Sequence, residues 1–154
     1  RMEYAWRFAS SSGESFEWFY NQVSTVAYLT EIGTDFQPPF DQTLAEVERV
    51  RPGWWLLLAL PRIGPLASGH VRDAVSGAPL AAKVTSDRVA FSEGERRSSD
   101  PDLGRFGWLL VPGPHQLTFS APGYESATQP VEVEVGGVEL EVDLAPLAAA
   151  EDDG

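Results

Sequence analysis

The chain has 154 residues, no cysteine and a formal net charge of −12, so disulfides, thiolate metal ligands and cysteine nucleophiles are excluded. The acidic balance argues against nucleic acid or anionic lipid as a partner, because both need Lys and Arg to neutralise phosphate. The longest apolar run, residues 54–60, is too short to span a bilayer.

Residues 1–40 are rich in aromatic residues, interrupted by Ser and Gly, and the chain begins with Arg1 rather than Met. We interpret this beginning as a position inside a longer protein. The lack of a secretory signal therefore carries no information about the compartment.

Residues 41–60 are predicted to form a helix, with Asp41 capping its first free N–H groups. Pro52-Gly53 lies inside this segment and predicts a kink or two short helices. Pro61 and the residues after it predict that the helix ends in a linker over 61–66. Apolar residues recur on one face of the predicted helix: Leu44, Val47, Trp54, Trp55 and Leu58.

Residues 67–146 predict short strands and turns. The clearest pattern spans 131–144, where Val or Leu alternates with Glu or Asp on both sides of Gly136-Gly137. Alternation with period 2 predicts a hairpin with one face in a core and the other in water, joined by a two-residue Gly-Gly turn. Further strands are predicted upstream, the first two as a pair around Ser76-Gly77: 68–73, 80–86, 105–111 and 115–119. Six or seven short strands predict a mainly β protein, an antiparallel sandwich or barrel.

Two segments resemble the carboxypeptidase regulatory-like domain. Residues 69–84 (GHVRDAVSGAPLAAKV) resemble its opening pattern of Gly-x-Val-x-Asp, a Ser-Gly-x-Pro-Leu turn and Ala-x-Val. Residues 104–124 (GRFGWLLVPGPHQLTFSAPGY) resemble its second pattern, in which strands alternate with Pro-Gly turns. The resemblance implies a prealbumin-like (transthyretin-like) antiparallel β-sandwich.

The preceding segment resembles the end of a zinc carboxypeptidase catalytic domain of the carboxypeptidase E/N/D type. Residues 12–20 (SGESFEWFY) are similar to that family's Gly-x-x-x-Asp-Trp-x-Tyr segment, with Trp18 as its Trp and Glu17 in place of the usual Asp. Residues 26–33 (VAYLTEIG) are similar to its last sheet strand. The resemblance implies that a strand-plus-helix fragment of an α/β zinc carboxypeptidase domain precedes the β-sandwich.

The resemblance also implies a narrow chemistry. In that family a glutamate at the end of this strand, here Glu31, takes a proton from zinc-bound water and passes it to the leaving amine. The zinc ligands, a His-x-x-Glu pair and a distant His, lie upstream of this segment, so we expect no catalytic zinc site in this chain. The family's active-site tyrosine falls at Ala9 here. Either a local insertion puts Tyr4 in that role, or the tyrosine is lost.

Other polar groups are expected to be structural. His70 and Asp73 are three residues apart on a predicted strand and face opposite sides, which argues against a metal pair. His115 stands where an inward-pointing, half-buried packing residue is expected. The carboxylates of 132–143 line strand faces, whereas calcium needs oxygens that converge from a loop, so a solvated face is expected. Trp54-Trp55 is expected to pack in a core or against the catalytic domain rather than to stack on a sugar.

The sequence therefore predicts a catalytic-domain fragment (1–60), a linker (61–66), a regulatory-like β-sandwich (67–146) and a disordered acidic tail (147–154). The expected function is the C-terminal portion of a zinc-dependent metallocarboxypeptidase that removes residues from peptide or protein C-termini, inactive alone. The alternative is a non-catalytic β-sandwich binding or adhesion module with a degenerate peptidase remnant. The resemblance favours a secreted or periplasmic location.

Overall fold

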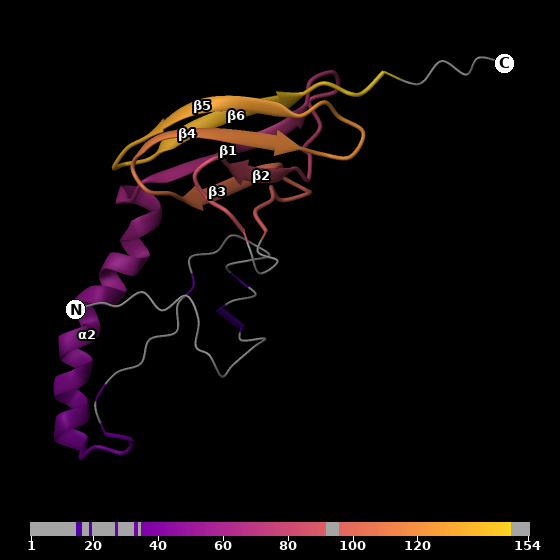
Figure 1. Cartoon of the computed structure of the whole chain (residues 1–154). Coiled ribbons are helices and arrows are strands. Elements are labelled where there is room, and N and C mark those ends of the chain that lie inside the picture. The colour runs from indigo at the N-terminus through magenta and orange to yellow at the C-terminus, as the bar shows by residue number, and fades with distance from the viewer. Residues whose placement is uncertain are drawn as a thin grey trace.

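The computed structural model describes residues 15, 16, 19, 27, 33, 35–91 and 96–148. In this part of the chain a long helix, α2 (Phe40–Ile63), projects from one end of a two-layered β domain (Figure 1). Six strands follow it: β1 (Leu66–Asp73), β2 (Lys83–Ser86), β3 (Arg105–Leu109), β4 (Gly113–Ser120), β5 (Ala127–Val133) and β6 (Val138–Leu144). Among the described residues, none of the helical segments combines the length and apolar character needed to cross a membrane.

The strands form two three-stranded sheets, ordered β3-β1-β6 and β2-β4-β5. β4 is antiparallel to both of its neighbours, and β1 is antiparallel to β3. β1 and β6 run parallel, in a register from Ala67↔Val138 to Asp73↔Leu144. The mainly β, two-sheet prediction is confirmed, but the antiparallel prediction does not hold for the β1–β6 pair.

The core lies between the two sheets. Inward residues alternate along each strand with half-buried or exposed ones, as on β4, where His115, Leu117 and Phe119 are buried. Phe106 packs edge-on against Phe119, with 5.1 Å between the ring centroids. The buried apolar residues of the described chain all come from the β domain: Ala67, Val71, Ala82, Val84, Phe106, Trp108, Leu110, Leu117, Phe119, Val131, Val133, Val142 and Leu144.

Gly69 is required in the middle of β1. Its φ is 155°, and a Cβ placed on it would lie 1.8 Å from the backbone oxygen of Leu140 on β6. No side chain fits at that distance, so a glycine here lets the two parallel strands approach.

β5 and β6 do not form the predicted hairpin. Gly136 and Gly137 do make a tight turn with positive φ, closed by the Gly137 N–H donating to the Glu134 oxygen at 3.0 Å. This turn carries the chain from one sheet to the other, so β5 pairs with β4 while β6 pairs with β1. Val135, predicted to point into the core, lies beyond the end of β5 and is 77% exposed.

The predicted pairing around Ser76-Gly77 is limited to the residues beside the turn, where the Asp73 N–H donates to the Ala78 oxygen and the Leu80 N–H donates to the Val71 oxygen. β1 and β2 belong to different sheets, and the two segments meet at an isolated bridge between Arg72 and Pro79. Alternation of apolar and polar residues shows which side of a strand faces inward, but it does not show which strand lies beside it.

α2 is confirmed as a helix but differs from its prediction at both ends and in the middle. It begins at Phe40 with Pro39 at the N-cap, so Asp41 lies in the first turn and makes no capping hydrogen bond. It continues through Pro52 as one helix and through Pro61 to Ile63, three residues into the predicted linker. The Gly64 N–H donates to the Leu60 oxygen at 2.8 Å and completes the last turn.

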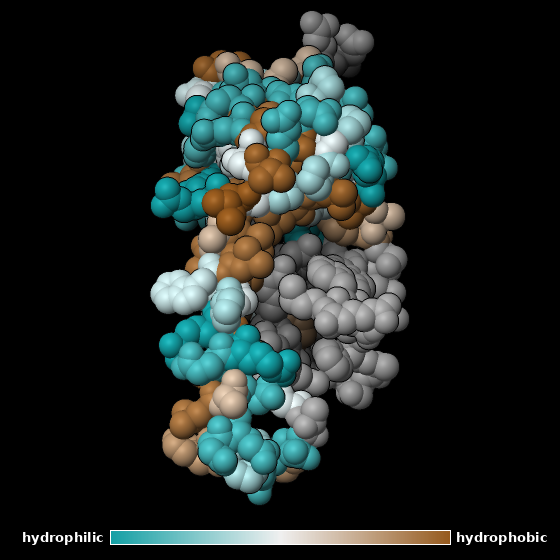
Figure 2. Space-filling view, turned by 90° about the vertical axis from the view of Figure 1, so that its left-hand side faces the viewer, coloured by the Kyte–Doolittle hydropathy of each residue, from teal (hydrophilic) through white to brown (hydrophobic). Residues whose placement is uncertain are grey.

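No residue of α2 is buried. Three of its large apolar side chains, those of Trp54, Trp55 and Leu58, are 55%, 67% and 71% exposed. The predicted apolar face therefore exists without a cover from the described residues, and Figure 2 shows hydrophobic surface around the junction of helix and β domain.

Candidate functional site

The predicted catalytic residue Glu31 lies outside the described residues, together with Ala9, Tyr4 and Trp18. The predicted strand 26–33 lies there too, apart from residues 27 and 33. The role of Glu31 thus stays a prediction.

A polar cluster lies on the outer face of the β3-β1-β6 sheet. The parallel register sets His70 of β1 directly opposite Glu141 of β6. Val71 and Val142, the next residues along, point into the core and are at most 1% exposed. Because side chains alternate, burying these valines forces His70 and Glu141 outward on the same side of the sheet.

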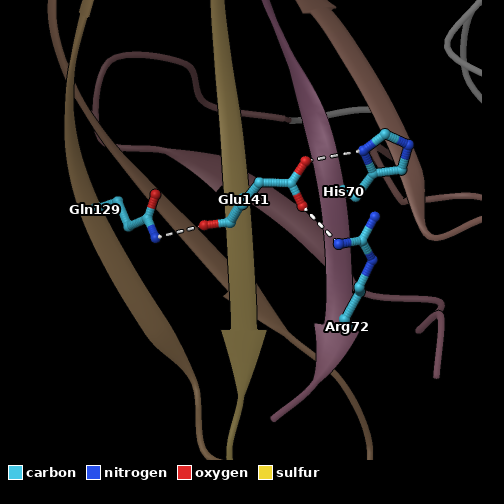
Figure 3. Close-up of polar contacts among 4 residues, drawn as sticks. All are labelled: His70, Arg72, Gln129 and Glu141. Atoms are coloured by element: carbon cyan, nitrogen blue, oxygen red, sulfur yellow. Dashed lines mark hydrogen bonds and ion pairs between the residues drawn. The ribbon is translucent and has the colours of Figure 1, made fainter. Parts of the chain in front are cut away.

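Glu141 contacts two side chains of β1 with its two carboxylate oxygens (Figure 3). Its Oε1 lies 3.2 Å from His70 Nδ1, and its Oε2 lies 3.0 Å from Arg72 Nη1. Its backbone oxygen accepts a hydrogen bond from Gln129 Nε2 of β5 at 3.4 Å, which links the two sheets at their edges.

These ionic contacts are partly open to water. The side chains of His70, Arg72 and Glu141 are 30%, 43% and 55% exposed. Exposed ion pairs contribute about 0–1 kcal/mol to folding, so the cluster is a weak source of stability. The cluster is of interest because it exposes an imidazole, a guanidinium and a carboxylate that could bind a ligand.

Glu139 completes a set of three metal-ligating side chains. It lies two residues before Glu141 on β6 and therefore on the same face. One ligand atom from each of His70, Glu139 and Glu141 lies within 4.8 Å of the others. This set contains one imidazole and two carboxylates, which are ligand types that zinc and other divalent transition metals accept.

A shallow groove of about 260 Å³ adjoins this set. It runs from the end of α2 to the Gly-Gly turn and is lined by Pro61, Leu66, Ser68, Gly136, Gly137, Val138 and Glu139. Glu139 is shared by the groove and the polar cluster, so the cluster has open space on one side.

Asp73 is not part of this cluster. It accepts hydrogen bonds from the Val75 and Ser76 N–H groups at 2.7 and 2.9 Å and from the Tyr124 hydroxyl at 2.8 Å. The Ser76 N–H, the Tyr124 hydroxyl and the Val75 N–H lower the pKa of Asp73, while Asp73 raises the pKa of Tyr124. Asp73 and Tyr124 together fasten the turn after β1.

His115 is a buried structural residue, 3% exposed rather than half-buried. Its Nε2 lies 2.8 Å from the Val111 oxygen, and its Nδ1 lies 3.0 Å from Ser86 Oγ. Because a carbonyl only accepts, Nε2 carries a proton, and in the neutral ring Nδ1 accepts from the Ser86 hydroxyl. Both ring nitrogens are therefore engaged in binding the β2 and β4 region together.

A buried cation beside two rings was not predicted. Arg97 is 2% exposed, and its guanidinium carbon lies 6.0 Å from the Phe91 ring centroid and 5.9 Å from that of Trp108. The two rings stack with centroids 5.5 Å apart. The aromatic neighbours of Arg97 become visible only through the fold.

The His70–Glu139–Glu141 set was also missed. Alternation alone places each of these residues on an outer face. Their meeting depends on the β1–β6 pairing, which joins positions 71 residues apart. The predicted hairpin would have placed β6 beside β5 instead, away from His70.

Comparison with known proteins identifies one family and distant structural likenesses. The Carboxypeptidase regulatory-like domain family matches residues 67–145. No curated protein matches the chain. A protein described as membrane-associated and of unknown function from Bacteroides fragilis is 22% identical, with a TM-score of 0.40 over 55% of this chain and 28% of its own.

Two further solved structures are similarly distant. Hydroxyquinol 1,2-dioxygenase from Pseudomonas putida is 14% identical, with a TM-score of 0.40 over 53% of this chain and 56% of its own. BcpA, the major pilin subunit of Bacillus cereus, is 15% identical, with a TM-score of 0.40 over 56% of this chain and 31% of its own. The chain thus spans less than two thirds of the length of each of these three proteins.

The family match covers the whole β-sandwich, from the second residue of β1 to the residue after β6. It coincides with the segments whose sequence patterns resemble that family. The chain belongs to the Carboxypeptidase regulatory-like domain family.

Proposed function

We propose that the chain acts as a non-catalytic accessory module, in which the β-sandwich folds on its own and α2 attaches it to an adjoining folded domain of the same protein. The observation that carries this proposal is the contrast in burial between the two parts. The described apolar core lies between residues 67 and 144, whereas α2 has no buried residue.

The exposed face of α2 supports the attachment. Fully burying a Leu or an aromatic side chain is worth about 1.5–3 kcal/mol. Trp54, Trp55 and Leu58 remain mostly exposed, so covering them offers several kcal/mol to a docking partner. A domain joined through the same chain is held close to this face at high effective concentration, which favours it over a separate protein.

Hydrogen exchange tests the module. We expect residues 65–148 alone to unfold cooperatively, with protected amides in β1, β4 and β6. In residues 35–148 we expect α2 to exchange fast, because its apolar face has no cover. In the product of the complete natural reading frame, α2 should be protected, and Leu58→Glu should remove that protection without affecting the strands.

Arg49→Gln is the matched control, because Arg49 is an exposed α2 residue on the side opposite the predicted apolar face. It should leave the protection of α2 unchanged. Strong protection of α2 in residues 35–148, or weak protection of the strands in residues 65–148, would contradict the proposal.

The second candidate is the C-terminal portion of a zinc-dependent metallocarboxypeptidase, with Glu31 as general base. It is favoured by the order of the segments around Trp18 and Glu31 before a Carboxypeptidase regulatory-like domain. The two histidines, His70 and His115, stand in His-x-x-Asp and His-x-x-Thr contexts, so the residues present do not fit the His-x-x-Glu zinc site of that family. Zinc would have to be bound by residues outside this chain.

Glu31→Gln in the product of the complete reading frame separates the two candidates. Release of C-terminal residues from peptides that falls at least a hundredfold in the variant would establish the enzyme, because loss of a general base costs about 10²–10⁴ in rate. The accessory module predicts no release of C-terminal residues that depends on Glu31. Ala9→Tyr, assayed beside it, asks whether restoring the family's tyrosine restores activity.

A further inference from the structure

We propose that His70, Glu139 and Glu141 form a surface site for one divalent transition-metal ion, with zinc as the representative. This site is separate from the catalytic zinc that the carboxypeptidase resemblance implies. It lies within the β-sandwich and uses a histidine and two glutamates from neighbouring strands.

The backbone prepares the site. In the β1–β6 ladder His70 pairs with Glu141 and Ser68 pairs with Glu139. Val71 and Val142, which directly follow His70 and Glu141, are packed in the core, so the strands cannot rotate the ligand side chains away. The three side chains therefore project from one rigid surface, and only their side-chain torsion angles need to change when an ion binds.

The distances suit a single ion. Zinc binds nitrogen and oxygen ligands at about 2.0–2.2 Å, which separates the ligand atoms of a tetrahedral site by roughly 3.4 Å. His70 Nδ1 and Glu141 Oε1 are 3.2 Å apart, close to this value. The whole set lies within 4.8 Å, so a small side-chain rotation, such as one of the exposed Glu139, brings the third ligand in.

The ligand set decides the class of metal. Calcium takes six to eight oxygen ligands, and magnesium keeps most of its waters. An imidazole beside two carboxylates instead favours zinc, copper, nickel or cobalt. Three protein ligands leave at least one position for water, and the groove beside Glu139 and Ser68 gives that water room.

Arg72 limits the affinity. Its guanidinium lies 3.0 Å from Glu141 Oε2, so it competes with the metal for one carboxylate and places a positive charge beside the ion. Removing this competing charge should strengthen binding, whereas removing a ligand atom of His70 or Glu139 should weaken it. Arg72 therefore gives the proposal a test with a sign opposite to that of the ligand variants.

Zinc titration of the whole chain, followed by calorimetry and by the ring signals of its two histidines, tests the site. We expect one zinc per chain and a shift of the His70 ring nitrogens, with the buried His115 ring unchanged. His70→Gln and Glu139→Gln should each weaken binding at least tenfold, Arg72→Met should strengthen it severalfold, and excess calcium should not displace the zinc.

The matched control is Glu134→Gln, which removes the same charge from an exposed residue of the segment after β5. It should change the affinity less than twofold. All four replaced residues are at the surface, so an unchanged thermal unfolding midpoint shows that each variant is folded. Zinc binding that is absent, that survives in His70→Gln, or that falls equally in Glu134→Gln would overturn the proposal.

Discussion

Gly69 lies where the backbone of β6 leaves no room for a side chain on β1. Gly69→Ala would place its Cβ against the Leu140 backbone oxygen at 1.8 Å, and backbone atoms cannot move aside as the end of a long side chain can. Crowding a packed region and holding a non-glycine residue at positive φ each cost about 1–3 kcal/mol. We expect Gly69→Ala to destabilise the domain by roughly 2–5 kcal/mol in urea unfolding.

Gly107→Ala on the neighbouring strand β3 is the control. A Cβ there would meet the Leu66 side chain at an ordinary contact distance of 3.8 Å, and its φ is not positive. We expect a change within about 1 kcal/mol. Equal effects of the two substitutions would show that β1 and β6 can separate at Gly69 without cost.

Asp73 makes the stability depend on pH. Its pKa is lowered in the folded protein by the Ser76 N–H, the Tyr124 hydroxyl and the Val75 N–H. The folded state therefore binds fewer protons than the unfolded state near the pKa of Asp73, and stability falls as pH falls. This contribution is fully present above the unfolded pKa of about 3.9 and disappears as pH drops through the lower folded value.

We expect Asp73→Asn to have a lower free energy of unfolding than the natural chain at pH 6. The difference between the two should become smaller below about pH 4. Urea unfolding at several pH values measures it. Tyr124→Phe should remove part of the same dependence, because the turn N–H groups still hold the carboxylate. If the difference in free energy of unfolding stays constant down to pH 2.5, the charge of Asp73 does not stabilise the turn.

At the scale of elements, the sequence predicted which segments are strands better than which strands are neighbours. The alternation of Val or Leu with Glu or Asp at 138–144 matches β6 at both ends. A strand with one buried face requires apolar residues at every second position, and the sequence shows this directly. The partners of β5 and β6 were missed, because a Gly-Gly turn can close a hairpin or carry the chain to the other sheet. Both outcomes keep Val131, Val133 and Val142 inward.

The ends of α2 were predicted less well than its existence. Its apolar spacing identified α2, but Pro52 and Pro61 were expected to break it. A proline inside a helix loses one hydrogen bond and crowds the preceding turn, at a cost of about 3 kcal/mol. α2 continues through both prolines, so the local cost predicted from the residue type did not decide where the helix ends.

The candidate site could not be predicted from the sequence, because the strand order was not known. Alternation predicts that His70 and Glu141 point outward, but their contact depends on the long-range pairing of β1 with β6. The same holds for Arg97 beside Phe91 and Trp108. Sites built from neighbouring strands become readable only after the strand order is known.

At the scale of the whole molecule, the β1–β6 pair joins the beginning of the domain to its end. Val71 pairs with Val142 across most of the sandwich. Contacts between such distant positions cost loop entropy before they form, which slows folding of β proteins. The core also requires both sheets, so neither sheet is expected to be stable without the other.

The parallel direction of these two strands has a mechanical consequence. The chain enters the domain at the start of β1, at Leu66, and leaves it after the end of β6, at Leu144. In a parallel pair these two points lie at opposite ends of the ladder, so tension pulling them apart acts along the strands and in opposite directions. The pairs from Ala67↔Val138 to Asp73↔Leu144 then bear the load together in shear, instead of opening one after another as in a zipper. Force applied between these two points is therefore resisted by all of the pairs at once.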